Sequence, residues 1–512
     1  KLYLNEINFS LIYSGTDNAY QSPLAQSRHR SNIVKTMIKS MVDNPQDVES
    51  CADKKVKIGN VASETSQERS NSNGGEMYID VLKEQIPDYI IITNRELHEE
   101  FQRLADWKIQ KGIPTIIKDI EDIRDEYIGS DLQEKIHAYL QECYMKWGEG
   151  LFVLLGGDTN IVPARFYVTN EGTFPSDAYY VDLSSDWNGN KNHIYAENND
   201  GLKGERKCIL GRASVENKNE VALFIDKVLA YERMNSPSLD TEYLMNHLAV
   251  SAYITKDENT DFLFNDAKES IDNYLKKYVQ LNEHKWYLFD HYNCTCNNHR
   301  DKREYTNGQE LNKVNFIATL NDGGDSGLNH FHIVYHMDHS TPRAMGTSCK
   351  DKFETMSIQE IDNLQNGEYQ QIIISGGCQT TCFEKDCVAE HFINNQIGGA
   401  VAFIGNANNG YAHEHYQYER FLKSLYNDNI QEIGLLFSSM TENDKSNMSY
   451  VRNEYYRLHL IGDPEMPVWS AVPQQLDIDA NVILLDSRPC QVSIQIKNLP
   501  EGEKAKVCLL KD

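Results

Sequence analysis

The chain has little positive charge and no long apolar run. Of its 512 residues, 76 are acidic and 50 are basic, which gives a net charge of -26. Such a charge repels phosphate backbones and anionic membrane surfaces, so we expect no nucleic-acid partner. No run reaches the ~18 consecutive apolar residues of a membrane-spanning helix, so we expect no membrane span.

Cysteines are also few, and their number is odd. The chain has 11 of them, which leaves at least one thiol unpaired even if all the others form disulfides. We expect Cys378 to be free. Cys382 and Cys387 are candidates to pair with each other or with Cys349, and the spacing leaves the connectivity open. The chain begins at Lys1 without a signal-like segment, from which we expect an exported protein whose signal has been removed.

Two short apolar runs that end near reactive side chains carry the most functional information. Residues 331–337 lead to His339, and residues 372–374 lead to Cys378. If both runs are buried parallel strands, their carboxyl ends meet at the edge where an open α/β sheet holds its ligand. An imidazole and a thiol at one edge indicate a cysteine nucleophile with a histidine base. The alternative is a buried core cysteine and an ordinary loop histidine.

The residues beside Cys378 suit such chemistry. Gly376 and Gly377 permit a tight turn after the strand and the close approach of a substrate backbone. The amide of Cys378 is a candidate donor to an oxyanion. A free thiol has a pKa near ~8.5, so a neighbouring imidazole is needed to take its proton or to hold the thiolate.

The pattern along the chain predicts an α/β fold of two sub-domains, residues 88–240 and 241–472, with mostly parallel sheets. From residue 88 onward, short apolar runs alternate with segments of helical period, which is typical of βαβ units. We expect strands over residues 89–93, 113–117, 151–156, 248–253, 286–290 and 399–405, and helices over residues 95–111, 132–147, 220–233 and 267–278.

The two ends of the chain differ from this core. Residues 1–87 lack the alternation, and residues 63–75 read as a polar linker, so the N-terminal segment is expected to be either a pro-segment or a small structural domain. Residues 473–512 contain polar-alternating runs without a helix signal. They resemble the start of an immunoglobulin-like sandwich but are too few for all its strands.

Several motifs resemble those of gingipain-like cysteine endopeptidases. The stretch YHMDHS at 335–340 resembles the Asn-Tyr-x-Gly-His-Gly-Ser stretch that holds the catalytic histidine of that family. The stretch GGCQTTCF at 376–383 resembles the one that carries its nucleophile. Further landmarks are WKIQKG at 107–112, FVLLGGD at 152–158, IVPAR at 161–165, LGR at 210–212, YER at 231–233, GGAVA at 398–402 and GDP at 462–464. The resemblance covers residues 88–469.

This resemblance implies a caspase-like fold and a cysteine endopeptidase that acts on polypeptides. Cys378 would be the nucleophile and His339 the base, and the amides of Ser340 and Cys378 would hold the oxyanion. The substrate cleft would include Gly377, Tyr253, Asn406 and Tyr411. Peptidases of this kind are commonly made with an inhibitory leader, which implies an intramolecular role for the N-terminal segment.

The chain also departs from the family pattern. Asp338 and Ser340 replace the glycines that flank the family histidine, and His336 is a second imidazole candidate at the position of the family's tyrosine. The altered loop sustains a second hypothesis, a non-catalytic surface or binding protein on the same scaffold. Tyr253 and Phe264 stand where trypsin-like gingipains have acidic residues, so we expect a cleavage preference other than strict Arg or Lys.

A candidate calcium loop lies in the first sub-domain. Asp186, Asn188, Asn190 and Glu197 supply oxygen atoms in the order used by calcium loops. Lys191 replaces the glycine that an EF-hand requires, so the loop is not an EF-hand. A similar Asp-rich stretch follows the SDAYY segment of gingipain-like sequences, a family that binds structural calcium. We expect structural calcium here, with a plain Asp/Asn turn as the alternative.

A group of possible zinc ligands lies at residues 291–299. It comprises His291, Cys294, Cys296 and His299. The Cys-x-Cys spacing is tighter than the gap of structural zinc sites, so a loop disulfide or two free thiols is favoured over zinc. A metal-dependent hydrolase at this group is a third hypothesis for the function.

Overall fold

The computed structural model describes residues 7–13, 86–197, 200–251, 266–279, 284–289, 310–347, 354–441, 454–473, 477–483 and 490–497. Tyr253, Phe264, Cys349 and the group at residues 291–299 lie outside these described residues. Across the described part of the chain, no helix combines the length and the apolar character needed to cross a membrane.

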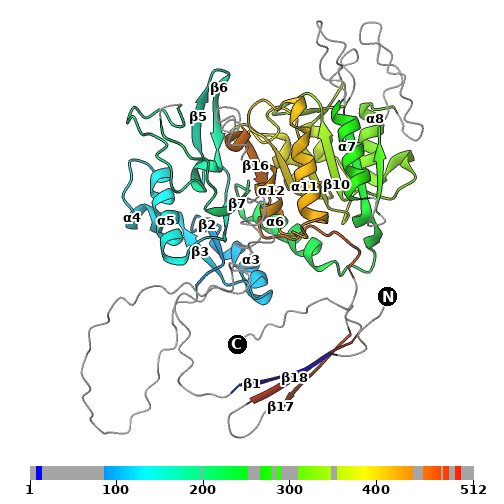
Figure 1. Ribbon diagram of the computed structural model, residues 1–512, viewed down its shortest axis with the longest axis horizontal. Coiled ribbons are helices and arrows are strands. Elements are labelled where there is room, and N and C mark those ends of the chain that lie inside the picture. The colour runs from blue at the N-terminus through cyan, green and yellow to red at the C-terminus, as the bar shows by residue number, and fades with distance from the viewer. Residues whose placement is uncertain are drawn as a thin grey trace.

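A ten-stranded sheet forms the centre of the molecule (Figure 1). Its strand order is β3-β2-β4-β7-β16-β15-β14-β10-β8-β9. The strands are β2 (Tyr89–Thr93), β3 (Thr115–Asp119), β4 (Leu151–Gly156), β7 (Cys208–Ala213), β8 (Asn246–Ser251), β9 (Lys285–Leu288), β10 (Ile333–Met337), β14 (Gln371–Ser375), β15 (Ala400–Asn406) and β16 (Leu458–Ile461). All neighbours pair in parallel except β15 and β16, which are antiparallel. The predicted α/β class with a mostly parallel sheet is confirmed.

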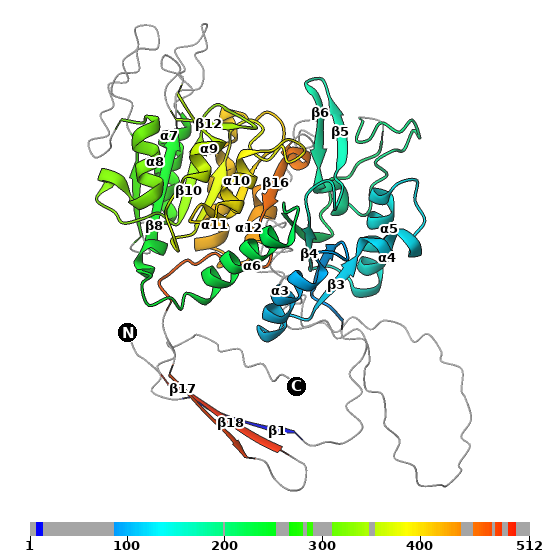
Figure 2. The ribbon, with the colours of Figure 1, turned by 180° about the vertical axis from the view of Figure 1, so that it is seen from behind.

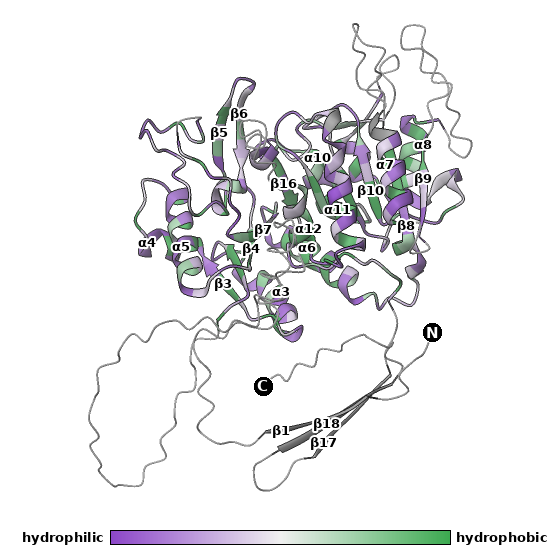
Figure 3. Ribbon diagram, in the orientation of Figure 1, coloured by the Kyte–Doolittle hydropathy of each residue, from purple (hydrophilic) through white to green (hydrophobic). Residues whose placement is uncertain are grey.

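Inner strands of the sheet are apolar on both faces because helices cover both faces. In β2, the residues from Tyr89 to Ile92 have no exposed surface, and all of β14 and β15 is buried. Figure 3 shows inner strands such as β4 in the hydrophobic colour, whereas helices such as α5 and α11 carry both colours. Continuous apolar runs of this kind are typical of parallel sheets.

Helices lie on both sides of the sheet. The α-helices are α3 (His98–Gln110), α4 (Ile120–Glu126), α5 (Leu132–Trp147), α6 (Lys218–Arg233), α7 (Asp266–Tyr278), α8 (Lys313–Asp322), α9 (Ile358–Asp362), α10 (Val388–Asn394), α11 (Tyr416–Tyr426) and α12 (Ile433–Met440). Short 3-10 helices are η1 (Asp177–Tyr180), η2 (Thr241–Met245), η4 (Gly324–Ser326) and η6 (Ala412–His415). Helices α7, α11 and α12 cover one face (Figure 1), and α6, α9 and α10 cover the other (Figure 2). The layers are therefore helix, sheet and helix.

The strands on either side of residue 240 form the two halves of this one sheet. Strands β2, β3, β4 and β7 precede that point, and β16 joins them to the later strands through the single pair Arg212–Ile461. Two smaller sheets lie outside the central one: the hairpin β5 (Arg165–Thr169) and β6 (Gly172–Ser176), and β11 (Ser340–Thr341), β12 (Ala344–Gly346) and β13 (Thr355–Ser357). The division into two sub-domains stays a prediction.

A separate three-stranded antiparallel sheet joins the two ends of the chain. Strand β1 (Ile7–Tyr13) pairs with β18 (Cys490–Lys497), which also pairs with β17 (Asp477–Ile483). Figure 1 shows β1, in blue, beside β17 and β18, in red. The β character expected after residue 473 is therefore present, and the immunoglobulin-like sandwich stays a prediction. The pairing of β1 was not expected from the sequence.

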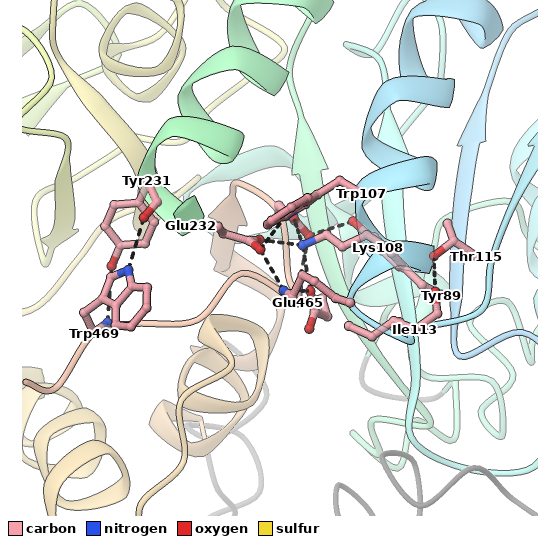
Figure 4. Close-up of polar contacts among 11 residues, drawn as sticks. Tyr89, Trp107, Lys108, Ile113, Thr115, Tyr231, Glu232, Glu465 and Trp469 are labelled. Atoms are coloured by element: carbon pink, nitrogen blue, oxygen red, sulfur yellow. Dashed lines mark hydrogen bonds and ion pairs between the residues drawn. The ribbon is translucent and has the colours of Figure 1, made fainter. Parts of the chain in front are cut away.

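A buried charge cluster connects α3, α6 and the turn after β16 (Figure 4). The Lys108 ammonium has no exposed surface and forms ion pairs with Glu232, Asp463 and Glu465 at 2.6–2.7 Å. The Tyr89 hydroxyl donates a hydrogen bond to Asp463 at 2.7 Å. Because a buried charge without a partner is costly, this cluster holds α3, α6 and this turn in register.

A second buried ion pair explains two of the sequence landmarks. The Arg212 guanidinium of the LGR motif donates to both carboxylate oxygens of Asp177 in the SDAYY motif, at 2.7 and 2.6 Å. It also donates to the carbonyl oxygens of Gly157 and Val162, at 2.7 and 2.8 Å. Both motifs therefore maintain the packing of the first half of the sheet.

Candidate active site

The expected nucleophile and base follow neighbouring strands of the central sheet. In the parallel pair β10 and β14, Tyr335 lies opposite Ile374, and in the parallel pair β14 and β15, Ile374 lies opposite Ile404. The carboxyl ends of the three strands therefore meet at one edge of the sheet. His339 follows β10, and Cys378 follows β14, so both residues start from this edge.

The loop that carries His339 and the turn that carries Cys378 are in close contact. A Cβ atom on Gly377 would lie 2.3 Å from Ser340 Oγ and 3.1 Å from the carbonyl oxygen of Asp338. The Gly376 amide donates a hydrogen bond to the carbonyl of His336 at 2.8 Å. Only a glycine fits at position 377 in this arrangement, and the structure thus brings both predicted segments together.

Cys378 is a free, half-buried thiol. Its Sγ atom lies 3.8 Å from the carbonyl oxygen of Gly410, to which it donates. Burial raises the pKa of the Cys378 thiol, whereas the bond to Gly410 and the positive charge of Arg457 lower it. Within the described residues, the backbone amide of Cys378 has no hydrogen-bond partner, so it is available to an oxyanion.

The loop after β10 is held by hydrogen bonds within the loop and from β12. The Asp338 carboxylate accepts the backbone amide of His339 at 2.6 Å, and the Gly346 amide donates to the His339 carbonyl at 2.7 Å. Ser340 pairs with Met345 in β11 and β12. His339 itself is half-buried. Asp338 and Ser340, which replace family glycines, therefore maintain a short folded loop.

The second imidazole candidate, His336, has a structural role. It is fully buried in β10, and its Nδ1 and Nε2 atoms lie 2.9 Å from Ser375 Oγ and 3.0 Å from the Gly346 carbonyl. Burial lowers the pKa of His336 to about 4. A neutral imidazole with both nitrogens engaged is unsuited to act as a base, which favours His339.

The residues expected to line the substrate cleft differ in exposure. Gly377 forms the contact with the His339 loop, and Tyr411 is half-buried, with its hydroxyl donating to Glu171 at 3.0 Å. Asn406 has no exposed surface. Its Nδ2 atom donates to the Gly377 carbonyl at 3.4 Å, so Asn406 supports the turn from behind instead of facing an open cleft.

The candidate calcium loop is held by its own hydrogen bonds. The Asp186 carboxylate accepts the amide of Asn188 at 3.0 Å, and the Glu197 carboxylate accepts the side-chain amides of Asn190 and Asn192 at 2.9 and 2.6 Å. Over the described ranges, no group of three or more His, Cys, Asp or Glu residues is placed to hold a metal. Two of the four predicted ligands are asparagines, which lie outside these residue types, and calcium binding stays a prediction.

The cysteines that follow Cys378 are not bridged. Cys382 and Cys387 are both free and fully buried, so the candidate disulfide between them is wrong. Burial raises the pKa of Cys382 to about 12. Among the free thiols, these two are inert, while Cys378 is partly accessible.

Three charged residues near Cys378 were not expected from the sequence. Arg457, which precedes β16, lowers the pKa of Cys378, and Glu171 and Glu414 raise it. Arg457 and Glu414 are almost fully buried and form an ion pair. No local motif marks these positions, because they reach the site from segments outside both predicted strands.

Comparisons with known proteins identify the family of the chain. The model of peptidase family C25 matches residues 82–469. Gingipain R2 and gingipain R1 of Porphyromonas gingivalis are each 27% identical over 157 residues, which is 30% of this chain and 18% and 13% of those proteins. The matched segment thus spans less than a fifth of the length of these curated relatives.

Solved structures show the same fold. The crystal structure of the Arg-specific cysteine proteinase gingipain R matches with a TM-score of 0.58 and 21% identity, and covers 78% of this chain and 82% of that chain. A complex of the pro- and mature domains of RgpB from Porphyromonas gingivalis matches with a TM-score of 0.56 and 20% identity, over 77% and 82%. With this caspase-like α/β fold and a family match over most of its length, the chain belongs to peptidase family C25.

Proposed function

We propose that the protein is a cysteine endopeptidase in which Cys378 is the nucleophile and His339 is the general base. Membership of peptidase family C25 supports the reaction class. The observation that carries the residue assignment is the contact between Gly377 and Ser340, because it places the turn before Cys378 against the loop of His339. The substrates are polypeptides.

In the first half of the reaction, the sulfur of Cys378 attacks the carbonyl carbon of the scissile bond while His339 takes the thiol proton. The resulting oxyanion accepts hydrogen bonds from the amides of Cys378 and Ser340. The carbon–nitrogen bond then breaks, the leaving amine takes the proton from His339, and a thioester remains. Water attacks this thioester with His339 as base, and the acid product and the free thiol are released.

The pKa of the Cys378 thiol determines at which step of the reaction its proton is transferred to His339. Burial raises the pKa of the thiol, so the neutral thiol predominates at neutral pH. His339 therefore takes the proton during the attack, instead of holding a thiolate before substrate arrives. This mode requires substrate to bring the sulfur and the imidazole into alignment.

We also propose that the N-terminal segment, residues 1–87, acts as a pro-segment and that the protein is exported. A structurally similar protein, RgpB, has been solved as a complex of its pro- and mature domains, which supports the pro-segment. Comparing kcat/KM before and after removal of residues 1–87 tests this role, and an increase after removal is the expected result. Export is tested by fractionating the natural host cells.

The nucleophile is tested with a variant and a matched control. Cys378→Ala is expected to abolish hydrolysis of an unfolded protein substrate, whereas Cys143→Ala, which alters another free but buried thiol, is expected to leave it intact. An electrophilic peptide is expected to label Cys378 alone, as read by mass spectrometry. Hydrolysis by Cys378→Ala at the wild-type rate would reject the assignment. Absence of both hydrolysis and labelling after removal of residues 1–87 would favour a non-catalytic binding protein.

A further inference from the structure

A buried arginine lies behind the turn that carries Cys378. The side chain of Arg457 is 1% exposed, and its Nε atom donates a hydrogen bond to Asn406 Oδ1 at 2.9 Å. The Nδ2 atom of Asn406 in turn donates to the carbonyl oxygen of Gly377. Two consecutive hydrogen bonds therefore connect the guanidinium to the residue that precedes Cys378.

The end of β15 and the residues that follow it, 406–411, also hold the nucleophile turn, residues 376–381, through backbone hydrogen bonds. The amide of Gln379 donates to the Asn408 carbonyl at 2.9 Å, and the amide of Thr381 donates to the Asn406 carbonyl at 3.1 Å. The amide of Ala407 donates to the carbonyl of Arg457 itself at 2.7 Å. A displacement of Arg457 therefore moves the segment that holds the nucleophile turn on both sides of Cys378.

The segment after β15 also contacts the sulfur atom of Cys378. Gly410, which accepts the Cys378 thiol, lies so close to the turn that a Cβ atom on it would be 1.9 Å from the Gly376 carbonyl oxygen. The next residue, Tyr411, has its ring 5.1 Å from the Arg457 guanidinium. The side chain of Arg457 thus contacts the supporting segment at Asn406 and Tyr411, in addition to the backbone bond from Ala407.

Within the described part of the chain, the charge of Arg457 has one buried counterion. Glu414 forms an ion pair with it and is 2% exposed. The pKa of Glu414 is raised to about 7, mainly by burial and also by the nearby carboxylate of Glu454, against the lowering effect of Arg457. The exposed Glu171, which accepts the hydroxyl of Tyr411, is the other acidic group that acts on Cys378. Below neutral pH, the positive charge of Arg457 is therefore only partly offset.

We propose that Arg457 is a positioning residue for Cys378, which holds the nucleophile turn through Asn406 and favours the thiolate through its charge, while Glu414 limits that charge. The proposal rests on the proposed function, since it assigns Cys378 as nucleophile. A purely structural ion pair would instead stabilise the fold without a directed effect on the thiol.

The two variants Arg457→Gln and Glu414→Gln separate these possibilities, because they remove charges of opposite sign at one ion pair. The measurement is the rate of alkylation of Cys378 by iodoacetamide from pH 5 to pH 10, read on the Cys378 peptide by mass spectrometry. For Arg457→Gln we expect a higher apparent pKa and about a tenfold lower rate at pH 7. For Glu414→Gln we expect a lower apparent pKa and a faster reaction at pH 8.

Two further variants complete the experiment. Arg457→Lys keeps the charge and loses the planar donor to Asn406, so alkylation is expected to stay within about threefold of wild type while kcat falls. Arg165→Gln is the control, since Arg165 is also a buried arginine in an ion pair, with Asp131 at 2.8 Å, and has no contact with the turn. It is expected to lower stability without moving the alkylation profile.

The proposal is overturned if Arg457→Gln and Glu414→Gln shift the profile in the same direction, or if neither moves it relative to Arg165→Gln. If Arg457→Gln does not fold, the opposite-sign prediction for Glu414→Gln and the kcat of Arg457→Lys decide. The alkylation readout does not require hydrolysis. If Cys378→Ala retains activity, the proposed function fails while the alkylation profiles still report on Arg457.

Discussion

The hydroxyl of Tyr418 donates a hydrogen bond to the backbone carbonyl of His336 at 2.7 Å, and it also accepts the amide of Gly376 at 3.0 Å. This buried side chain of α11 therefore bridges the end of β10 and the start of the turn that carries Cys378. The relative position of the proposed base and nucleophile depends on this bridge as well as on the sheet.

Removal of that hydroxyl is expected to affect catalysis more than stability. Tyr418→Phe leaves the buried carbonyl of His336 with the Gly376 amide alone, so the free energy of unfolding should fall by about 1–2 kcal/mol. We expect kcat/KM on a peptide substrate to fall at least tenfold, because the turn loses one of its supports. The matched control is Tyr426→Phe, which removes the hydroxyl of a partly buried tyrosine of the same helix that contacts His247 at 3.0 Å. Equal losses of kcat/KM in both variants would contradict the bridging role.

The contact at Gly377 predicts a substitution that a second change can relieve. Gly377→Ala places a Cβ atom within 2.3 Å of Ser340 Oγ, so the His339 loop must move and activity should fall by more than about a hundredfold. Adding Ser340→Gly removes the clashing side chain, and the double variant should recover part of the activity. The measurement is kcat/KM for the three proteins. A double variant no better than Gly377→Ala would show that the loss has another cause.

The buried histidine of β10 predicts a pH-dependent stability. Burial lowers the pKa of His336 to about 4, below the ordinary value of 6.5 that it regains on unfolding. The unfolded chain therefore binds one proton more between these values. The stability linked to His336 is complete above pH 6.5 and is lost as the pH falls towards 4, by about 3 kcal/mol in total.

This prediction is tested by difference, because Glu390 and Glu414, whose pKa values burial raises to about 7, act in the opposite direction over part of the range. Urea unfolding of the wild type and of His336→Gln is compared at several pH values from 6.5 to 4. The wild type should lose stability more steeply, by about 1.4 kcal/mol per pH unit. Parallel pH profiles would show that His336 is protonated in the folded protein.

The charge cluster at Lys108 predicts a large loss of stability. Lys108→Met leaves three buried carboxylates without their central cation, so the free energy of unfolding should fall by about 3–5 kcal/mol. Lys111→Met is the control, since the Lys111 ammonium contacts Glu232 and Glu465 but is 24% exposed. Its effect should be clearly smaller. Denaturant unfolding measures both, and equal losses would mean that burial of the cation is unimportant here.

Calcium binding at residues 186–197 predicts that chelation lowers Tm and that Glu197→Gln removes the difference between calcium and chelator. Thermal unfolding in calcium and in EGTA measures this. An unchanged Tm in the wild type would show that the bonds from Asn190 and Asn192 to Glu197 hold the loop without a metal.

Local sequence pattern predicted much of the fold. The bounds of β2, α5 and β4 agree with the sequence to the residue, because apolar runs define the strands and Asp131, which accepts the amide of Glu134, caps the helix. The start of β8 was missed because its first residues are the polar Asn246 and His247. His247 is buried against the Tyr335 hydroxyl at 3.1 Å, a partner that only the folded sheet supplies.

The residues of the candidate site were also predicted only in part. Cys378 and His339 were predicted as site residues because each follows an apolar run that ends in a turn, and their catalytic roles stay a prediction. Arg457 and Glu414 were not found, since their link to Cys378 passes through Asn406 and Gly410, which belong to a third segment. Ion pairs and hydrogen bonds between segments that are far apart in the sequence produce no local or periodic sequence pattern.

The strand β1 has a consequence for proteolytic processing. Its seven residues pair with β18, from Ile7–Ile496 to Tyr13–Cys490. The two paired strands therefore come from opposite ends of the chain, before and after the residues of the central sheet. A single nick anywhere between residues 14 and 85 would therefore leave the severed N-terminal peptide attached as a noncovalent subunit. Such a nicked protein would elute as one species in native gel filtration and run as two bands under denaturing electrophoresis.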